Sequence, residues 1–407
     1  MLDTLIQALK KNLRSYILII ALVAIWLAFG MAAPGYWTAD HIQSVVTQMA
    51  IIAIMACGMV FVIVTGGIDL SVGFGAGFVS VVGAALLYYG TIEEPLVKMF
   101  PDMSEGAVAI TVTIVVIILS IILGILIGLF QGSLIAYLKV PPFIVTLGGM
   151  YIFKSGILIV TQGKTLFFSN ESFKFIAQGF IPPIAGLILA ALVTLILFVY
   201  VLASRKRKIK HGIDVGSLTI DIIKTSFSAL LIFGYVLIVN RTFDEEAIPE
   251  ISGVPFLVII LAIIFTLMSY ISTNTRFGRY TYAIGGNREA ARLSGINIDK
   301  TILMVYVAMG ILVAVSGIAL AAYVGSGTTS AGQGYELDVI ASCILGGTST
   351  LGGEGSVFGA IVGALIMQSL SNGLQMMNVS SNFQYLIKGL VLILAVLADI
   401  SMKKKHA

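Results

Sequence analysis

Charged and polar side chains are scarce in this sequence, and those that interrupt its apolar stretches are the first candidates for function. Asp69 lies in the glycine-rich run Thr65–Gly73, between two long apolar stretches. An ionisable residue in such a place marks a solute path by default. Asp69 could equally be the N-cap of the helix that follows, and the sequence leaves both interpretations open. Few other ionisable residues lie as deep: Lys154, Asp338 and Lys388.

The residue types that carry covalent chemistry form no recognisable constellation. Cys57 and Cys343 lie inside apolar stretches and have no metal or redox spacing. The three histidines are scattered through polar segments. Gly163-Lys164-Thr165 resembles the end of a phosphate-binding loop, but Leu158 stands where that motif needs its first glycine. We therefore expect neither an enzyme nor a cofactor or metal on this chain.

One polar segment, residues 273–300, contains the pattern of a short helix with both ends marked. Asn287 can cap a helix that runs through Leu293, and Gly295 can end it. Its apolar side would carry Ala290, Ala291 and Leu293, and its polar side Arg288, Glu289 and Arg292. Such a helix is too short to be stable alone. We expect it to press against a partner surface, either the membrane-facing bundle or another protein, to which it could transmit motion.

Two glycine-rich turns match at an offset of 280 residues. Gly66, Gly67 and Gly73 of the first turn align with Gly346, Gly347 and Gly353 of the second. Both turns join apolar segments in the same expected orientation, which is typical of a parallel repeat, although a chance match is the alternative. Glycine at membrane depth permits close helix contact, or irregular backbone beside a cavity. We predict broken helices near a solute path at these turns.

The elements that must position these residues are apolar and numerous. Of the 407 residues, 58% are hydrophobic and 11% charged, and the mean hydropathy is +1.04. Soluble domains contain roughly 25% charged residues, and a membrane-crossing helix needs about 20 apolar ones. Such stretches occur at 16–35, 43–65, 74–90, 106–137, 142–163, 181–203, 219–240, 254–272, 301–325, 357–375 and 384–402.

A twelfth segment, 334–348, is short and broken by glycines, so that it either crosses or only re-enters. We predict an all-α polytopic membrane protein: one transmembrane domain over residues 1–407, with about 12 transmembrane segments, a parallel internal repeat and short broken or re-entrant segments. The first stretch follows basic residues and could be a signal peptide. Its length and its continuation into the next span favour a retained helix.

Basic residues set the expected orientation, because cytosolic loops carry an excess of Lys and Arg. With a cytosolic N-terminus and twelve crossings, most of the 24 basic residues fall inside, including the expected loop Arg205–Lys210 and the terminal Lys403–Lys405. Without the twelfth crossing Lys403–Lys405 would lie outside, so both termini are expected in the cytosol. The net charge of +4 is small, and no soluble basic face is present to bind nucleic acid.

Several motifs now point to a family. Thr65–Gly73, Pro142–Gly148, Tyr282–Asn287 and Leu345–Gly355 occur in collinear order. Together, over residues 15 to 402, they resemble the ribose and xylose branch of the permease subunits of bacterial ABC importers for monosaccharides. Residues 286–297, residues 372–379 and the extra pair of apolar segments in 181–240 resemble the xylose type. Gly67 departs from it, because the xylose type tends to have an acidic residue there.

The resemblance implies a transport subunit in the bacterial cytoplasmic membrane, with xylose as the expected sugar and ribose or galactose as alternatives. ATP would be hydrolysed by separate ATPase subunits, which would dock on the coupling loop 273–300 at Asn287, Arg288, Glu289, Ala290, Ala291, Arg292 and Gly295. An external sugar-binding protein would deliver the sugar to two permease copies, most simply a homodimer, with a heterodimer left open.

A sugar path needs polar partners in an apolar bundle. The candidates are Asp69, Ser71, Asn372, Gln375 and Gln384. Each could instead form a hydrogen bond between helices. A transporter driven by an ion gradient is the alternative function, and it would need several ionisable residues at mid-membrane for coupling.

Overall fold

The computed structural model of the protein describes residues 13–212, 215, 217–240 and 253–404. Lys10 and Lys11, which precede the first apolar stretch, and Lys405 of the terminal Lys403–Lys405 lie outside these residues. The elements are α2 (Leu13–Ala32), α3 (Ala39–Val64), α4 (Val72–Tyr88), α5 (Glu93–Met99), α6 (Glu105–Ala136), α7 (Pro142–Thr161), β1 (Leu166–Phe167), α8 (Glu171–Gln178), β2 (Phe180–Ile181), α9 (Pro183–Lys210), α10 (Leu218–Val239), β3 (Val254–Pro255), α11 (Phe256–Asn274), α12 (Arg276–Gly286), α13 (Arg288–Leu293), α14 (Ile298–Val324), β4 (Ser326–Gly327), α15 (Tyr335–Leu345), α16 (Val357–Met376) and α17 (Ser381–Lys404).

The described residues are mostly helical, and the long helices suit a bilayer. Eight of the described helices are long and apolar enough to cross a membrane: α3, α6, α7, α9, α10, α11, α14 and α16. Helices α4 and α5 pass the same criteria as one pair bent by 40°, which raises the number to nine. The apolar parts of α2 and α17 are shorter, at Leu18–Ala32 and Ser381–Leu397. The protein is therefore a multi-pass membrane protein, and α15, with 11 residues, is too short to cross as a helix.

The chain divides into two compact units. The larger, unit 1, comprises the described parts of Met1–Tyr36, Val45–Gln178 and Leu257–Ala407. The smaller, unit 2, comprises Trp37–Ser44 and the described parts of Gly179–Phe256, and so holds α9 and α10. In unit 2, β2 pairs antiparallel with β3, and the Gln43 side chain donates to the carbonyls of Val239 and Gly253. These hydrogen bonds tie Gln43, near the start of α3, to the end of α10 and to the residue that precedes β3.

The core of unit 1 is built around α3 and the pair α6–α14. Most side chains of α3 in this unit are fully buried. Helices α6 and α14 approach until backbone meets backbone, because Gly124 faces Gly310 and Gly128 faces Tyr306, where an added Cβ would collide with main-chain atoms. Small residues permit such contact between membrane helices. A short antiparallel pair, β1 with β4, closes one end of this unit.

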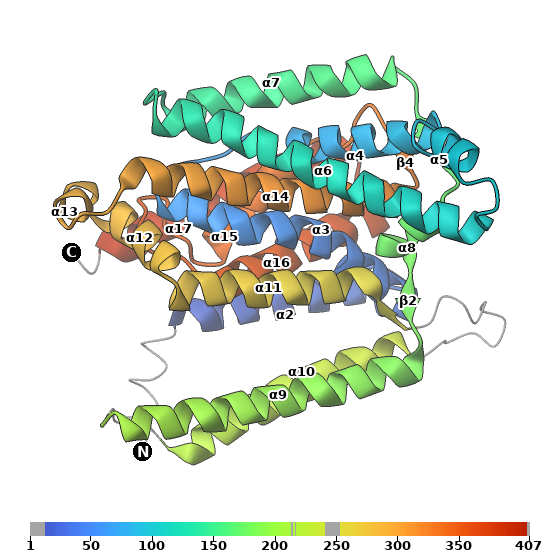
Figure 1. Ribbon diagram of the computed structural model, residues 1–407. Coiled ribbons are helices and arrows are strands. Elements are labelled where there is room, and N and C mark those ends of the chain that lie inside the picture. The colour runs from blue at the N-terminus through green and yellow to red at the C-terminus, as the bar shows by residue number, and fades with distance from the viewer. Residues whose placement is uncertain (1–12, 213–214, 216, 241–252, 405–407) are drawn as a thin grey trace. The chain divides into compact units, whose positions relative to one another are not determined.

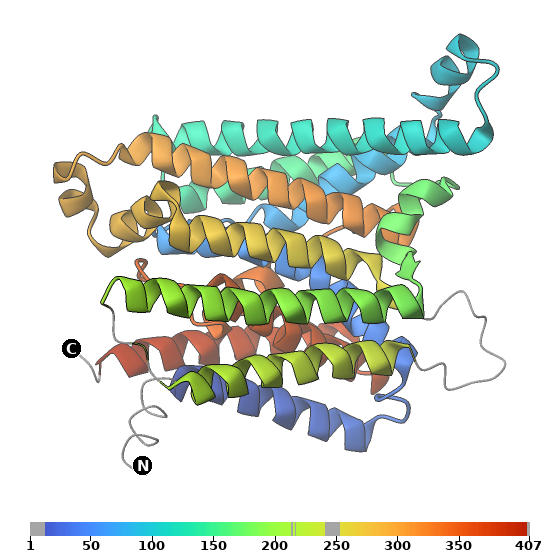
Figure 2. The ribbon, with the colours of Figure 1, turned by 60° about the horizontal axis from the view of Figure 1, so that its bottom comes forward.

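Figures 1 and 2 show the long helices of unit 1 lying alongside one another, with α13 at one end and α5 at the opposite end. The C-terminal end of α3, the α6–α7 connection and α12 lie at the end that carries α13, since they contact one another or α13 there. We call this the α13 end of unit 1. The functional residues described below divide between the α13 end and the α16–α17 turn.

One sequence expectation about a polar segment was wrong, and one helix in another polar segment was not predicted. The stretch Arg205–Lys210 was expected to be a loop, but it continues α9 to its last residue. Lys and Arg favour helix and suit a helix C-terminus, and Arg205 forms an ion pair of 2.9 Å with Asp221 of α10. The first part of segment 273–300 also forms a helix, α12, which was not predicted. Thr275 caps it by accepting a hydrogen bond from the Gly278 N–H at 3.2 Å.

Candidate functional site

The first glycine turn ends α3 with a Schellman motif. Gly66 has φ +83°, its N–H donates to the Ile63 carbonyl at 2.9 Å, and the Gly67 N–H donates to the Val62 carbonyl at 3.0 Å. This is the arrangement in which a glycine in the left-handed region closes a helix C-terminus. The chain then runs without helix to Val72, where α4 begins. The predicted break at Gly66 and Gly67 is therefore present.

Asp69 and Ser71 are held in a buried network beyond this turn. One Asp69 carboxylate oxygen accepts from the Ser71 N–H at 2.8 Å and from the Ser71 hydroxyl at 2.6 Å. The Gln131 amide of α6 donates to the Ser71 hydroxyl at 2.8 Å. Burial raises the pKa of Asp69 to about 6, against the lowering effect of the two Ser71 hydrogen bonds. Both candidate path residues thus stabilise the turn and are enclosed by protein.

Asp69 is not an N-cap, which was the structural alternative for it. Ser71 occupies the N-cap position of α4, and its own side chain makes no capping bond. The Asp69 carboxylate instead accepts from the N–H of Ser71, two residues further along the chain, and so fixes the backbone just before α4 begins. This is the local hydrogen bond that short acidic side chains favour in turns.

The second glycine turn repeats this cap at the end of α15. Gly347 has φ +97°, its N–H donates to the Ile344 carbonyl at 3.0 Å, and the Thr348 N–H donates to the Cys343 carbonyl at 2.9 Å. The residue in the Gly66 position is therefore Gly347 and not Gly346. The non-helical stretch is also longer here, because α16 begins only at Val357. The alignment at an offset of 280 thus does not superpose equivalent backbone positions.

Three backbone segments meet at the α13 end. The Gly353 N–H of the second turn donates to the Val64 carbonyl, in the last residue of α3, at 2.9 Å. An added Cβ on Gly285 of α12 would collide with that same carbonyl and would lie 2.5 Å from the Gly353 nitrogen. The Tyr282 hydroxyl of α12 donates to the Gly355 carbonyl at 3.0 Å. This junction joins α12 to the end of α3 and to the second turn.

Helix α13 follows α12 with the caps that the sequence predicts. The Asn287 side chain accepts from the Ala290 N–H at 2.9 Å, and Gly295, with φ +80°, follows the end of the helix. Ala291 is buried, whereas Leu293 is 78% exposed. The helix therefore offers a large apolar side chain to its surroundings at its C-terminal end.

The charged side of α13 is solvated. Glu289 and Arg292 form an ion pair of 2.6 Å between two side chains that are each about two-thirds exposed. Exposed pairs of this kind contribute little to folding, roughly 0–1 kcal/mol. Within the part of the chain that the structure describes, the Arg288 side chain makes no ion pair. Six of the seven predicted docking residues are exposed, and Ala291 is the buried one. Residues 287–290 form a contiguous exposed run.

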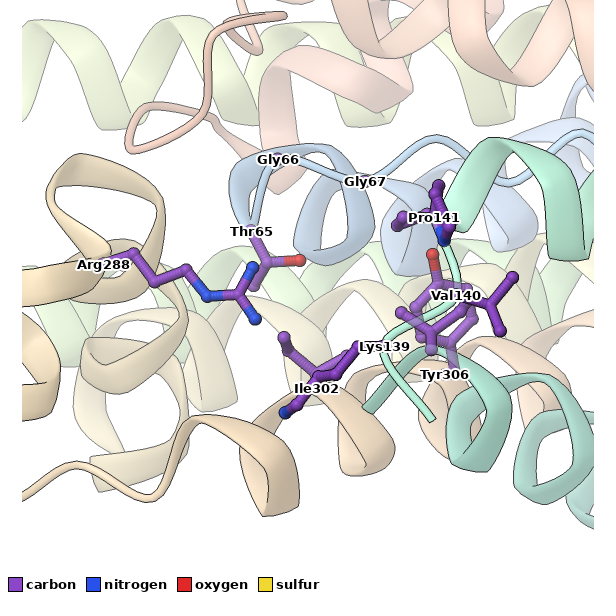
Figure 3. A pocket seen from close by; sticks show the side chains of 11 residues that line it. Thr65, Gly66, Gly67, Lys139, Val140, Pro141, Arg288, Ile302 and Tyr306 are labelled. Carbon is purple, nitrogen blue, oxygen red and sulfur yellow. The ribbon is translucent and has the colours of Figure 1, made fainter. Parts of the chain in front are cut away.

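A cavity of about 390 Å³ opens beside this helix. Figure 3 shows Arg288 extending from α13 toward it, with Tyr306 on the opposite side. The walls come from the first glycine turn, the α6–α7 connection, α13 and α14. The lining residues are Thr65, Gly66, Gly67, Ile135, Lys139, Val140, Pro141, Pro142, Arg288, Ile302 and Tyr306. Segments far apart in the sequence form this cavity, and no local motif predicted it.

The other three candidate path residues lie around the turn between α16 and α17. Asn372 is buried and donates to the Gln48 amide oxygen at 3.4 Å, and Gln368 donates to the same oxygen at 2.8 Å. Gln384 donates to the Val379 carbonyl at 2.8 Å, and Gln375 is exposed. The five candidates therefore do not form one cluster, since Asp69 and Ser71 belong to the first turn.

The deep ionisable residues all have partners. Lys388 of α17 forms an ion pair of 2.8 Å with Asp338 of α15, with side chains 16% and 7% exposed. The Lys154 ammonium lies 5.6 Å from the centroid of the Phe74 ring. The sequence contained a weak signal for the Asp338–Lys388 pair, namely opposite charges in two apolar segments, α15 and α17, which α16 separates along the chain. Among the described residues no group of three or more His, Cys, Asp or Glu could hold a metal ion.

Comparisons of the sequence with known proteins identify a family for this chain. The family model described as "Branched-chain amino acid transport system / permease component" matches residues 41–396. The xylose transport system permease protein XylH of Haemophilus influenzae is 39% identical over 395 residues, which cover 97% of this chain and 98% of that protein. XylH of Escherichia coli K12 is 37% identical over 97% of this chain and 93% of its own length.

A ribose permease is more distant. The ribose import permease protein RbsC of Haemophilus influenzae is 31% identical over 95% of this chain and 92% of its own length. No solved structure matches the chain. The family match and these near-complete alignments agree with the multi-pass helical fold and with the resemblance seen in the motifs. The chain therefore belongs to this family of permease components of transport systems, in the branch that includes the xylose and ribose permeases.

Proposed function

We propose that this chain is the membrane subunit of an ATP-binding-cassette importer that carries xylose, with ribose or galactose as alternative sugars. Identities of 39% and 37% to two xylose permeases, against 31% to a ribose permease, support the choice of sugar. The chain would supply the path for the sugar and the helices that transmit movement from the ATPase, with no covalent chemistry of its own. ATP would be hydrolysed on partner subunits.

The backbone junction at Gly285 is the observation that carries the coupling mechanism. An ATPase subunit would bind α13 at its exposed polar residues and at Leu293. Movement of α13 passes to α12, from which it is separated by Asn287 alone. Helix α12 touches the Val64 carbonyl and the second glycine turn without intervening side chains. Packed backbones transmit displacement well, because close-packed interiors have low compressibility.

Twelve crossings form part of this proposal. Besides the nine apolar helices or bent pairs, α2, α17 and the segment from α15 through the second turn would each cross. The contacts at the two ends of the segment from α15 through the second turn support its crossing. Gly334, before α15, lies against Tyr385 near the start of α17, whereas Gly353 bonds to the end of α3. The helix and its extended continuation would together reach across the bilayer, with both termini in the cytosol.

Partners follow from the same mechanism. Two copies of the chain, in the bacterial cytoplasmic membrane, would assemble with two ATPase subunits. They would receive the sugar from an external binding protein. An ion-coupled transporter is not proposed. Asp69, Lys154, Asp338 and Lys388 are each engaged by a hydrogen bond, a ring or an ion pair, as described above.

The test is reconstitution. The chain would be co-purified with its ATPase subunits into lipid discs, and ATP hydrolysis measured with the binding protein and xylose, ribose, galactose or glucose. We expect stable co-purification and stimulation by xylose-loaded binding protein. A lack of co-purification, together with uptake into ATP-free vesicles under an ion gradient, would overturn the proposal. Stimulation by another sugar alone would correct the substrate and keep the mechanism.

A further inference from the structure

A second cavity, of about 460 Å³, opens at the α13 end of unit 1. The last two turns of α11, the helix α12 and the start of α16 form its walls, with Ser269, Thr273, Arg279, Ser356 and Phe358 among the lining residues. Helices α11 and α16 are both long and apolar enough to cross a membrane, and the cavity lies where one ends and the other begins. Polar headgroups border the ends of such helices, so the cavity lies at headgroup depth.

The cavity presents a positive charge and hydrogen-bond donors. Arg279 is exposed, and among the described residues its side chain forms no ion pair. The Ser356 hydroxyl accepts from the Gly359 N–H at 3.2 Å, so its own proton is free to be donated. The N–H groups of Val357 and Phe358, in the first turn of α16, have no carbonyl partner within the helix. Phosphate oxygens match the planar donor fork of an arginine.

The charge of the cavity is not balanced by its own walls. Among the residues that the structure describes, no acidic side chain lines the cavity. The Arg279 side chain also differs from Lys139, at the first cavity, which is paired with Asp299. The cavity therefore favours an anion, and the exposed hydroxyls of Thr273 and Ser356 could bond further polar groups of the same ligand.

An apolar surface continues from the cavity toward the middle of the membrane. Phe358 lines the cavity and is 64% exposed, and the centroid of its ring lies 6.3 Å from that of Phe265 on α11. Further from the cavity on α11, Leu267 and Ile263 are more than half exposed. In a helix that crosses a membrane, such side chains face acyl chains. A soluble anion would contact the cavity alone, whereas a lipid would contact both the cavity and this surface.

We propose that this cavity holds the headgroup of an anionic phospholipid, with the phosphate at Arg279 and Ser356 and an acyl chain along Phe358 and Phe265. Basic pockets between membrane helices recur as sites for such headgroups. A zwitterionic lipid fits less well, because its ammonium group finds no acidic partner in the walls. The proposal concerns this chain alone, so its test does not depend on the ATPase or on which sugar is transported.

The test measures lipid binding to the purified full-length chain in detergent by native mass spectrometry. The probes are phosphatidylglycerol and phosphatidylcholine with identical acyl chains, and soluble glycerol 3-phosphate as a competitor. We expect the first phosphatidylglycerol to bind about tenfold more tightly than phosphatidylcholine, because only its net charge complements the cavity. Glycerol 3-phosphate at equal concentration should not displace it, since it has no acyl chain.

Three variants separate the parts of the site, and a thermal unfolding midpoint shows that each is folded. Arg279→Gln is expected to weaken phosphatidylglycerol about fivefold and to leave phosphatidylcholine within about twofold. Phe358→Ala should weaken both lipids to a similar extent, because it removes the acyl-chain contact. Arg276→Gln is the matched control, since Arg276 is an exposed arginine of the same helix that does not line the cavity. It should leave both affinities unchanged.

Three results would overturn the proposal. Phosphatidylglycerol could bind no more tightly than phosphatidylcholine, or Arg276→Gln could weaken it as much as Arg279→Gln, which would show a general attraction to basic residues and no site. Displacement by glycerol 3-phosphate would assign a soluble phosphate as the occupant. If Arg279→Gln leaves phosphatidylglycerol binding unchanged and lowers co-purification with the ATPase, the cavity belongs to a protein interface.

Discussion

The two glycine turns of unit 1 share a helix cap and differ in what holds the chain beyond it. After Gly66 the chain is fixed by side chains, since Asp69, Ser71 and Gln131 form one buried network. After Gly347 the Ser349 hydroxyl accepts a local hydrogen bond from the Leu351 N–H at 3.1 Å, but the contacts of this turn with the Val64 carbonyl and with Gly285 are made through its backbone. Leu351, in the middle of the second turn, is exposed.

This difference separates two tasks. A turn fixed by a buried polar network keeps one geometry, because each broken hydrogen bond leaves a buried group unsatisfied. A turn held through backbone contacts with α12 moves when α12 moves. We therefore regard the first turn as a fixed support for α4 and the second turn as the element that the coupling helices displace. The following substitutions test this distinction, from the largest expected loss of stability to the smallest.

Gly285→Ala should have the largest effect. The new methyl group would overlap the Val64 carbonyl and force α12 away from α3 and the second turn. Overpacking of this kind destabilises by about 1–3 kcal/mol, and we expect transport to be lost as well. The thermal midpoint and sugar-stimulated ATP hydrolysis would be measured together. Gly286→Ala is the control, because an added Cβ there meets nothing within 4 Å. Equal effects of the two substitutions would show that the backbone contact at Gly285 is not what stability and transport depend on.

Gln131→Leu breaks the network of the first turn. The Ser71 hydroxyl loses its donor from α6, and we expect a loss of about 1–2 kcal/mol in the free energy of unfolding. Thermal unfolding in detergent would measure it, and Gln375→Leu, at an exposed position, should change little. A midpoint equal to that of the unsubstituted chain would show that the network does not hold the turn.

Gly295→Trp strains the end of α13. A tryptophan would have to adopt φ +80°, which we expect to destabilise the local structure by about 1 kcal/mol and to uncouple ATP hydrolysis from transport while the bundle stays folded. Gly163→Trp is the matched control at the β1 end of α7, with φ +76° and open space around it. If Gly295→Trp transports normally, docking at α13 is not the coupling contact.

Glu289→Lys should have the smallest effect on stability and a large effect on coupling. It removes an exposed ion pair worth under about 1 kcal/mol, so the unfolding midpoint should stay the same. We expect stimulated ATP hydrolysis or co-purification with the ATPase to fall. Glu171→Lys breaks a pair of the same spacing on α8, between Glu171 and Lys174 at 2.8 Å, and should leave both unchanged. Similar results for the two variants would argue against docking at Glu289.

Local signals in the sequence were sufficient for α13 and for the breaks after α3 and α15. Asn287 and Gly295 mark the ends of α13 because caps depend on residues within one turn of the helix. The long apolar segments were predictable for the same kind of reason, since bilayer thickness fixes their length. The family could be inferred because several such motifs occur in collinear order.

Features that depend on distant residues could not be predicted. Helix α12 was not predicted, because its polar surface hides the contacts that Tyr282 and Gly285 make with the second turn. The sequence alignment paired Gly66 with Gly346, whereas Gly347 holds the equivalent cap position in the structure. Neighbouring glycines cannot be told apart in the sequence. The cavity joins Thr65, Lys139 and Tyr306, and their proximity follows only from the packing of α3, α6 and α14.

The contact at Gly285 also has a genetic consequence. Its close partners are the Val64 carbonyl and the Gly353 nitrogen, atoms that every replacement at those positions would retain. No substitution at Val64 or Gly353 can therefore make room for a larger residue at position 285. A selection for revertants of Gly285→Ala should return glycine itself, or distant changes that shift a whole helix, and no suppressors from the residues in direct contact.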